Sequence, residues 1–246
     1  MERLDKLLAL QGLGSRSDVK ELIRRGRVLV NGRPCFDPGQ KTDPEKDEVL
    51  VDGQAVHMAV LGYGMLNKPA GILTAANDRR AKTVVDLLPE RYKAMGLMPA
   101  GRLDKDAHGL LFFTNDGPLA HFLLSPKRHV AKEYLVQVNG PLNNADVLAF
   151  KNGLALSDFT AQPAKLDILE TGQQESKAMV TLKEGKFHQV KRMFLCRGLT
   201  VTDLQRISFG SLRLDEDLPE GGFRELSEVE IAALRRDAYG EEQCNA

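Results

Sequence analysis

The sequence lacks the features of a membrane-bound or secreted protein. No stretch approaches the roughly 18 uncharged apolar residues of a membrane-spanning helix. The opening residues, MERLDKLLAL, carry acids and contain no apolar run of the kind found in a signal peptide. The three cysteines lie far apart, and none stands in a CxxC pair. This usage fits a reducing compartment and argues against a disulfide framework or a structural zinc site. We therefore expect a cytoplasmic protein that does not bind membranes.

Several motifs of enzyme chemistry are missing too. The chain has no GxxxxGK[ST] phosphate loop, no GxGxxG after a strand, no GxSxG elbow and no catalytic-cysteine context. A methyltransferase or a deaminase would need a glycine-rich donor loop or a zinc signature, and neither is present. The five histidines are scattered. We therefore expect no cofactor and no metal, so that any reaction runs on side chains alone.

The sequence also lacks a net charge, because 34 basic residues balance 34 acidic ones. The balance hides a strong asymmetry. Residues 1–33 hold eight Lys/Arg against four Asp/Glu, and residues 53–214 hold 21 against 14. The excess of acid lies in residues 34–52 and 215–246. Since local charge decides what a surface attracts, the neutral total does not argue against a nucleic-acid partner.

The first part of the chain predicts two short helices followed by a small β element. In RLDKLLAL (3–10) and SRSDVKELIRR (15–25), apolar residues follow the i, i+3, i+4 spacing of a helix face. Ser15 is placed to cap the second helix. The segments VLVNG (28–32) and DEVLVDG (47–53) read as partner strands that end in Asn-Gly and Asp-Gly turns.

Basic residues line the polar faces of these two helices and the turn after them. They are Arg3, Lys6, Arg16, Lys20, Arg24, Arg25 and Arg27. A solvated helix surface is one interpretation. However, RLDKLL, the GxxSR step and ELIRRGRVLVNG closely resemble the S4 RNA-binding module over residues 2 to about 56. The resemblance implies that the basic face binds structured RNA. S4 modules occur in proteins of several functions, so this part predicts a partner and not a reaction.

The second part predicts an α+β domain with a mainly antiparallel, mixed sheet and flanking helices. Residues 54–62 are expected to form a linker. The segments that read as strands are YGMLNKPAGIL (63–73), with a turn at Lys68-Pro69, KEYLVQVNG (132–140), KAMVTLKEG (177–185) and TVTDLQRISFGSLRL (200–214). GPLAHFLL (117–124) and NNADVLAFKNG (143–153) read as helices. The mixture has no regular βαβ rhythm. We expect domains at 1–58 and 59–236, with a disordered tail at 237–246.

One carboxylate stands out in the stretch PAGRLDKDAHGLLFFTNDG (99–117). Asp104 precedes a strongly apolar segment, where a charge is costly unless a partner or a reaction needs it. An ion pair or a helix cap is the simple interpretation. Two further segments favour a catalytic role for Asp104 over a structural one. The segment KEY (132–134) offers an aromatic ring at a strand start, and EGKFHQVKRMFLCRG (184–198) offers Lys191 and Arg192 at a strand-to-helix junction.

Together these segments closely resemble the three core motifs of RNA pseudouridine synthases. GRLD with GLLFFTNDG, KEYLVQVNG and EGKFHQVKRM occur in the family's order. With KPAG at 68–71 and the S4 module in front, the chain is similar to the RsuA/RluB/E/F branch over about residues 2–235. KFHQVKRMF (186–194) looks most like the branch member that acts on 16S rRNA, and a 23S rRNA target is the alternative. The resemblance implies an isomerase that converts uridine to pseudouridine without a cofactor.

The resemblance also implies roles for individual residues. Asp104 is the catalytic carboxylate, which either attacks carbon or removes a ribose proton. Lys191 is its basic partner. Tyr134 stacks on the target base after the uridine is flipped out of its helix. Arg102 binds phosphate or fills the space of the flipped base, with a structural role in the GRLD loop as the alternative. His188 and Gln189 are read as supports of the junction.

One position departs from the family. The usual pattern D-x-D-T/S-x-G has a hydroxyl residue where this chain has Ala107. The three reacting groups are still present, so activity is expected. A rival interpretation is an rRNA-binding assembly factor without chemistry, which would have no need of Asp104, Tyr134 and Lys191 as a set. We expect a monomer that acts on rRNA, free or within an assembly particle.

Overall fold

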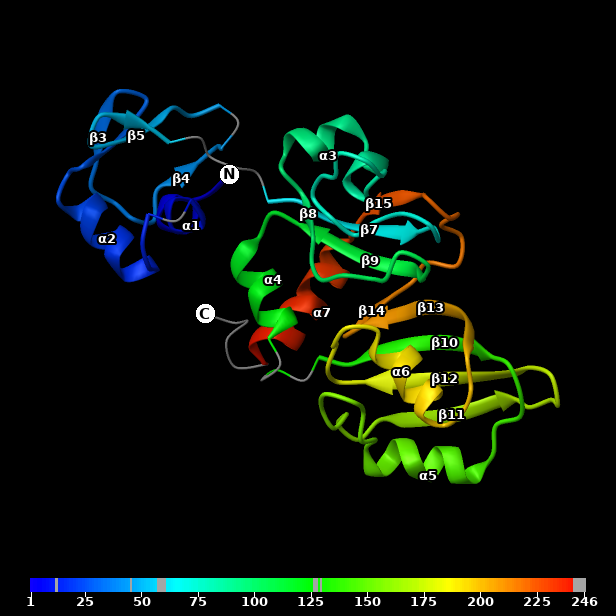
Figure 1. The fold of residues 1–246 in the computed structure, drawn as a ribbon. Coiled ribbons are helices and arrows are strands. Elements are labelled where there is room, and N and C mark those ends of the chain that lie inside the picture. Colours follow the sequence, from blue (N-terminus) through cyan, green and yellow to red (C-terminus); the bar gives the residue numbers. More distant parts are fainter. Residues whose placement is uncertain (12, 45, 57–60, 126–127, 129, 241–246) are drawn as a thin grey trace. The chain divides into compact units, whose positions relative to one another are not determined.

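The computed structural model describes residues 1–11, 13–44, 46–56, 61–125, 128 and 130–240 (Figure 1). The chain divides into two compact units, residues 1–61 and 62–246. The domain boundary expected between residues 58 and 59 lies outside the described residues. Within the described ranges, no helix is both long and apolar enough to cross a membrane.

Unit 1 (residues 1–61) joins two helices to two small antiparallel sheets. In chain order, its elements are β1 (Glu2–Arg3), α1 (Leu4–Leu10), α2 (Arg16–Arg24), β2 (Val28–Val30), β3 (Arg33–Cys35), β4 (Lys41–Thr42), β5 (Val49–Val51) and β6 (Gln54–Ala55). The strands form one sheet in the order β3-β2-β5-β6 and a second sheet of β1 with β4. Both predicted helices and the pairing of β2 with β5 are confirmed.

The helices of unit 1 form because their apolar residues share one face and their ends are capped. Leu4, Leu8, Val19 and Ile23 are fully buried in one core with the strand valines. Burial of each such side chain contributes about 1.5–3 kcal/mol. The Ser15 side chain accepts a hydrogen bond from the amide of the third helical residue, which completes a capping box at the start of α2.

Two tight turns extend the sheet of unit 1 beyond the two predicted strands. Asn31 and Asp52 have φ angles of 51° and 53°, and each is followed by a glycine with positive φ. These are the conformations of two-residue hairpins, so each strand folds back on itself. The expected linker at 54–62 is therefore wrong at its start. Gln54–Ala55 form β6, paired with β5, while residues 57–60 lie outside the described part of the chain.

Unit 2 (residues 62–246) contains one large sheet with helices around it (Figure 1). In chain order, its elements are β7 (Tyr63–Lys68), the 3₁₀ helix η1 (Val85–Leu87), α3 (Glu90–Ala94), β8 (Met98–Pro99), β9 (His108–Thr114), α4 (Gly117–Leu124), β10 (Lys132–Val138), α5 (Asn144–Asn152), β11 (Lys165–Glu170), β12 (Ser176–Leu182), α6 (Gln189–Cys196), β13 (Val201–Phe209), β14 (Leu212–Arg213), β15 (Phe223–Glu225) and α7 (Glu228–Tyr239). The segments predicted as strands and helices all form such elements.

The large sheet runs in the order β11-β12-β10-β13-β9-β7-β15, with β14 on β13 and β8 on β9. Among the described strand pairs, only β9 with β13 is parallel, and that pairing is confined to His108 and Gly109 opposite Gln205 and Arg206. The expected α+β fold with a mainly antiparallel, mixed sheet is confirmed. The short parallel contact lies just after the loop that carries Asp104.

Alternation along the strands builds the core around this sheet. On β10, Tyr134, Val136 and Val138 are buried on one face, as their period-two spacing predicts. They belong to one cluster with the buried face of α6, in which Phe194 packs on Phe150 of α5 at a ring distance of 4.9 Å. The site-bearing segments of β10 and α6 are thus fixed by a shared core.

The last helix corrects the expected start of the tail. Residues 237–239 form the final turn of α7 instead of a disordered segment. Ala238 is fully buried, the Asp237 carboxylate accepts a hydrogen bond from the amide of Ser211, and Tyr239 packs on Phe122 of α4. These contacts hold the turn in place. Residues 241–246 lie outside the described part of the chain.

Candidate active site

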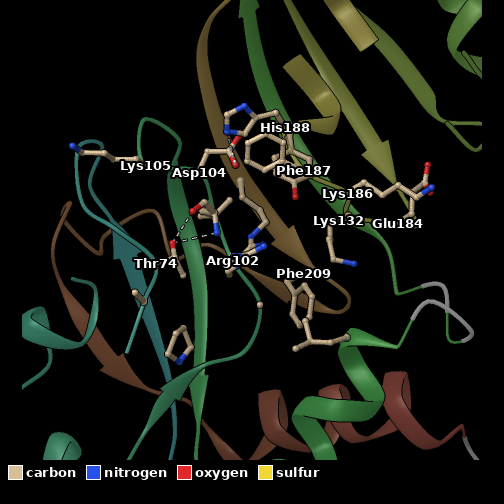
Figure 2. A pocket seen from close by; sticks show the side chains of 18 of the residues that line it. Thr74, Arg102, Asp104, Lys105, Lys132, Glu184, Lys186, Phe187, His188 and Phe209 are labelled. Atoms are coloured by element: carbon tan, nitrogen blue, oxygen red, sulfur yellow. Dashed lines mark hydrogen bonds and ion pairs between the residues drawn. The ribbon is translucent and has the colours of Figure 1, made fainter. Parts of the chain in front are cut away.

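The loop that carries Asp104 is held from inside the protein by Lys68. This lysine ends β7 and is fully buried. Its Nζ donates to the carbonyls of Ala107, Pro69 and Lys105 at 2.7, 3.1 and 3.2 Å. The Thr74 hydroxyl adds a second tie, since it donates to the Leu103 carbonyl and accepts from the Leu103 amide (Figure 2). The loop backbone on both sides of Asp104 is therefore anchored.

Lys68 anchors the Asp104 loop in a way that the sequence did not reveal. The KPAG motif indicated a turn and supported the family resemblance, but it assigned Lys68 no role. Burial lowers the pKa of Lys68 to about 8, and the nearby charges of Asp106 and Asp104 oppose that shift. A buried amine is costly unless its donors are satisfied, and the three carbonyls satisfy those of Lys68.

Asp104 faces two basic side chains from α6 and the residue before it. The Lys191 Nζ lies 3.5 Å from one carboxylate oxygen, and the His188 Nε2 lies 3.6 Å from the other. The Asp104 side chain is 24% exposed, so it remains accessible to a substrate. Lys191 also bonds Asp106 at 2.5 Å and thereby lowers the pKa of Asp106. The structure thus brings Asp104 and Lys191 together, with Lys191 shared between two carboxylates.

The junction before α6 has an unusual backbone that presents His188 and Phe187. His188 adopts the left-handed conformation, with φ 50° and ψ 30°, as the residue that caps the helix. The Phe187 ring stacks on the His188 ring at 3.8 Å and is itself 70% exposed (Figure 2). Gln189, in contrast, is buried and bonds Glu184 and the Lys186 amide. Gln189 therefore has the geometry of a support for the junction.

A pocket of about 1080 Å³ opens in front of Asp104. Arg102, Asp104 and Tyr134 all line it, while Lys191 contacts Asp104 without being one of the lining residues. The basic residues that line it are Arg102, Lys105, Lys132, Lys183, Lys186, His188 and Arg206, against the acidic Asp104 and Glu184. The positive lining favours an anionic ligand such as a nucleic acid. Among the described residues, no group of acidic, His and Cys side chains is arranged to hold a metal ion.

Arg206 and Lys132 are pocket residues that the sequence analysis also missed. Arg206 belongs to the buried face of β13, in the alternating pattern of Leu204 and Ser208. An arginine on an apolar strand face was the available signal. Lys132 begins β10, two residues before Tyr134. Burial, with the nearby charge of Arg206, lowers the pKa of Lys132 to about 8.

Ala107 fills the position of the expected hydroxyl residue. It is fully buried in the same cluster as Tyr134, and its carbonyl accepts one of the Lys68 hydrogen bonds. The side chain of residue 107 therefore points into core, where a hydroxyl would need a partner of its own. The adjacent His108 bonds Asp203 at 3.0 Å.

Arg192, next to Lys191, turns away from Asp104. It pairs with Asp158, donates to the Ser157 hydroxyl at 3.0 Å and lies over the Phe159 ring. The two neighbouring cations of the motif therefore have different partners: Lys191 contacts Asp104, and Arg192 pairs with Asp158.

In unit 1, three of the seven basic residues gather around one buried carboxylate. Arg3 bonds both oxygens of Asp5 at 3.0 Å, and Arg16 and Lys20 lie 3.8 and 4.0 Å from it. Burial would raise the pKa of Asp5, but the bonds and charge of Arg3 hold it below its ordinary value. The Arg3, Arg16 and Lys20 side chains are still 41–50% exposed. Asp5 therefore orients a group of cations that remain accessible.

The other four basic residues are arranged individually. Lys6 pairs with Glu2, Arg25 with Glu21 and Arg27 with Asp52. Arg24 is exposed at the end of α2 and has no ion pair with any residue in the described ranges. All of these contacts are surface pairs of the kind that an incoming phosphate can replace.

Comparison with known proteins identifies both parts of the chain. A model of the RNA pseudouridylate synthase family matches residues 62–195, and a model of the S4 domain matches residues 2–49. A solved structure described as a pseudouridylate synthase is 35% identical, with a TM-score of 0.67, over 95% of this chain and 100% of that one.

Relatives match along nearly their whole length. An uncharacterised RNA pseudouridine synthase of Bacillus subtilis, YtzG, is 42% identical over 94% of this chain and 98% of its own. Ribosomal small subunit pseudouridine synthase A of Yersinia pestis is 38% identical, over 94% and 97%. Ribosomal large subunit pseudouridine synthase B of B. subtilis is 35% identical, over 96% of each. The chain therefore belongs to the RNA pseudouridine synthases, in the RsuA/RluB family, with an S4 domain ahead of the synthase domain.

Proposed function

We propose that this enzyme converts one uridine of 16S rRNA to pseudouridine, with Asp104 as the catalytic carboxylate. The observation that carries the proposal is the pocket itself: Asp104 and Tyr134 line it together, and Lys191 lies 3.5 Å from the Asp104 carboxylate. The choice of 16S over 23S rRNA rests on KFHQVKRMF, whose His188 reaches within 3.6 Å of Asp104. Relatives named for both ribosomal subunits are similar to this chain.

The proposed chemistry needs only groups of this chain. An ionised Asp104 either bonds to C1′ of the ribose or removes a proton from the sugar, and the N1–C1′ bond breaks. The detached base turns and C5 bonds to C1′, while the Asp104–C1′ bond breaks or, in the other route, Asp104 returns the proton to the sugar. C5 then loses its proton and N1 gains one. Reactant and product are isomers, so no oxidant or group donor is consumed. Lys191 would place its positive charge 3.5 Å from the Asp104 carboxylate, and His188 would flank the other oxygen at 3.6 Å.

Substrate capture would use the remaining proposed residues. A uridine would leave its helix to enter the pocket, and the Tyr134 ring would stack on the flipped base. Arg102, which lines the pocket and has no ion pair within the described part of the chain, would contact a flanking phosphate. The basic residues of unit 1 would bind the surrounding rRNA through phosphate contacts.

Pseudouridine mapping tests this proposal. Purified wild-type protein would be incubated with unmodified 16S and 23S rRNA, as free transcripts and as assembly particles. Asp104→Asn is the inactive comparison, and Asp106→Asn is the matched control, because it removes a neighbouring carboxylate of the same loop. We expect a single new pseudouridine in 16S rRNA with wild type and Asp106→Asn only.

Other outcomes would change the proposal in defined ways. A site in 23S rRNA would retain the reaction and overturn the 16S target. No modification of either rRNA, with tight binding intact, would favour the assembly-factor interpretation and leave Asp104 as an ion-pair residue.

A further inference from the structure

The buried arginine on β13 has a hydrogen-bond donor with no described partner. Arg206 is 2% exposed and yet lines the pocket. Its Nε donates to the Leu110 carbonyl at 2.7 Å, and the Tyr134 hydroxyl forms a further hydrogen bond with it. Its Nη2 is buried without a partner among the described residues. A buried unpaired donor is costly, and sites of this kind are commonly completed by a ligand.

Arg206 also has no ion-pair partner among the described residues. Lys132 is the second cation beside it, and the one bond of its Nζ within the described ranges is to the Val130 carbonyl, at 2.9 Å. The two cations lie over the same Phe209 ring, 5.3 and 5.6 Å from its centre. Neither forms an ion pair within the described ranges. A buried cation next to a partly buried one, with no carboxylate paired to either in the described ranges, is unfavourable unless negative charge arrives from outside.

We infer that Arg206, assisted by Lys132, binds the uracil oxygen that carries negative charge when the N1–C1′ bond breaks. This inference rests on the proposed function. In that step, the electron pair of the N1–C1′ bond stays on the base. C1′ then bonds to the Asp104 carboxylate or, if Asp104 removes the neighbouring sugar proton instead, forms a double bond to that sugar carbon. The resulting uracil anion spreads its charge from N1 onto O2 and O4. When C5 bonds to C1′ and loses its proton, N1 is protonated and the charge is gone.

The position of Arg206 favours the base over a phosphate as its ligand. Its Tyr134 contact places it beside the ring on which the base is proposed to stack. A phosphodiester needs solvent or several donors, and the more exposed cations of the pocket, Lys105 and Lys186, offer such a site. A donor preorganised toward a charge that exists only during the reaction stabilises the transition state selectively.

The test compares two leaving groups in two variants. Arg206→Gln and Lys132→Met would be assayed in single turnovers on rRNA carrying uridine or 5-fluorouridine at the target position. Fluorine stabilises the base anion, so cleavage of the N1–C1′ bond then depends less on the protein. Arg213→Gln, an exposed arginine of β14 that pairs with Glu133 outside the pocket lining, is the matched control.

We expect Arg206→Gln to lower the cleavage rate on uridine by about 10²–10³-fold, with a clearly smaller loss on 5-fluorouridine. Lys132→Met is expected to change the ratio of the two cleavage rates, on 5-fluorouridine and on uridine, in the same direction but by less. Arg213→Gln is expected to leave that ratio unchanged. Lys132→Met also tests the inference should Arg206→Gln fold poorly, because its amine anchors no strand.

Equal losses on both substrates would assign Arg206 a structural role and overturn the inference. A loss confined to RNA affinity, with the ratio unchanged, would indicate a phosphate ligand and overturn it too. The activity of the wild-type protein on uridine separates the proposed function from the role inferred for Arg206. If the wild-type protein forms no pseudouridine, the proposed function itself is wrong.

Discussion

At the scale of single residues, the feature of most interest in the candidate active site is that Lys191 lies near two carboxylates, those of Asp104 and Asp106. Its Nζ lies 2.5 Å from Asp106 but 3.5 Å from Asp104. Asp106 is 74% exposed, so water weakens that pair, whereas Asp104 is more enclosed. We therefore expect the longer contact to matter more for the proposed role of Asp104, because charge interactions strengthen as water is excluded.

Lys191→Met should lower kcat by about 10²-fold, the scale of one electrostatic contact at a reacting group. Lys191→Arg should restore much of the rate because it keeps the charge. Steady-state kinetics on rRNA checks this. Arg192→Gln is the control, because Arg192 is the neighbouring cation and pairs with Asp158 instead of Asp104. A Lys191→Met enzyme with the wild-type rate would show that Asp104 does not depend on this cation.

The residues that sequence reasoning found and missed differ in a physical way. Asp104, Tyr134 and Lys191 stand in motifs with fixed local spacing. Lys68 and Arg206 act through contacts across the sheet, to Ala107 and Leu110, that no local pattern encodes. Long-range partners of this kind could be assigned only once the strand order was known.

At the scale of elements, the parallel junction of β9 with β13 lies directly after the loop that carries Asp104 and fixes the end of that loop. Gly109 has φ +97°, and a Cβ there would lie 2.4 Å from the Arg206 carbonyl oxygen. Both backbone conformation and space therefore require glycine. The sequence predicted the strand of β13 but not this junction, since parallel pairing leaves no turn signal between partners.

Gly109→Ala should destabilise the protein by about 2–4 kcal/mol, from strain and from displacement of β13. Gly117→Ala is the control, because that glycine has ordinary φ and open space around its Cβ position. Urea unfolding of both variants measures the difference. Equal free energies of unfolding for the two would contradict the packing described for the junction.

The start of α7 carries the clearest dependence on pH. Hydrogen bonds from Arg224 and from Ser227 lower the pKa of Glu230 to about 2, despite its partial burial. Because the folded pKa lies below the ordinary 4.5, this stabilisation is complete above pH 4.5 and is lost as pH falls toward 2.

Glu230→Gln should therefore cost about 1–2 kcal/mol at pH 7, a value discounted for solvent screening. The difference from wild type should shrink as the pH falls from 4.5 toward 2. Chemical unfolding across that range checks it. A cost that stayed constant with pH would assign the effect to packing and not to the charge.

At the scale of the whole molecule, the chain forms two units with separate cores. The proposed RNA-binding residues of unit 1 are surface cations, and the residues proposed to react all lie in unit 2. Changes to the cations should therefore alter affinity without altering the chemical step.

Arg24→Ala with Arg25→Ala should weaken rRNA binding and reduce the slope of log affinity against log salt by about 1–2. The rate at saturating RNA should stay unchanged. Titrations at several salt concentrations test this against Lys165→Ala with Lys177→Ala, which removes two cations of β11 and β12. An unchanged affinity and slope in the Arg24/Arg25 variant would place the RNA face elsewhere.

The central claim is that the Asp104 carboxylate carries out the isomerisation. Formation of the C5–C1′ bond expels the hydrogen of C5, so release of tritium from rRNA labelled at uridine C5 reports the reaction directly. We expect release with wild type and with Asp106→Asn, and a loss of about 10³-fold or more with Asp104→Asn. Release at the wild-type rate from Asp104→Asn, with its fold and RNA affinity intact, would contradict the account.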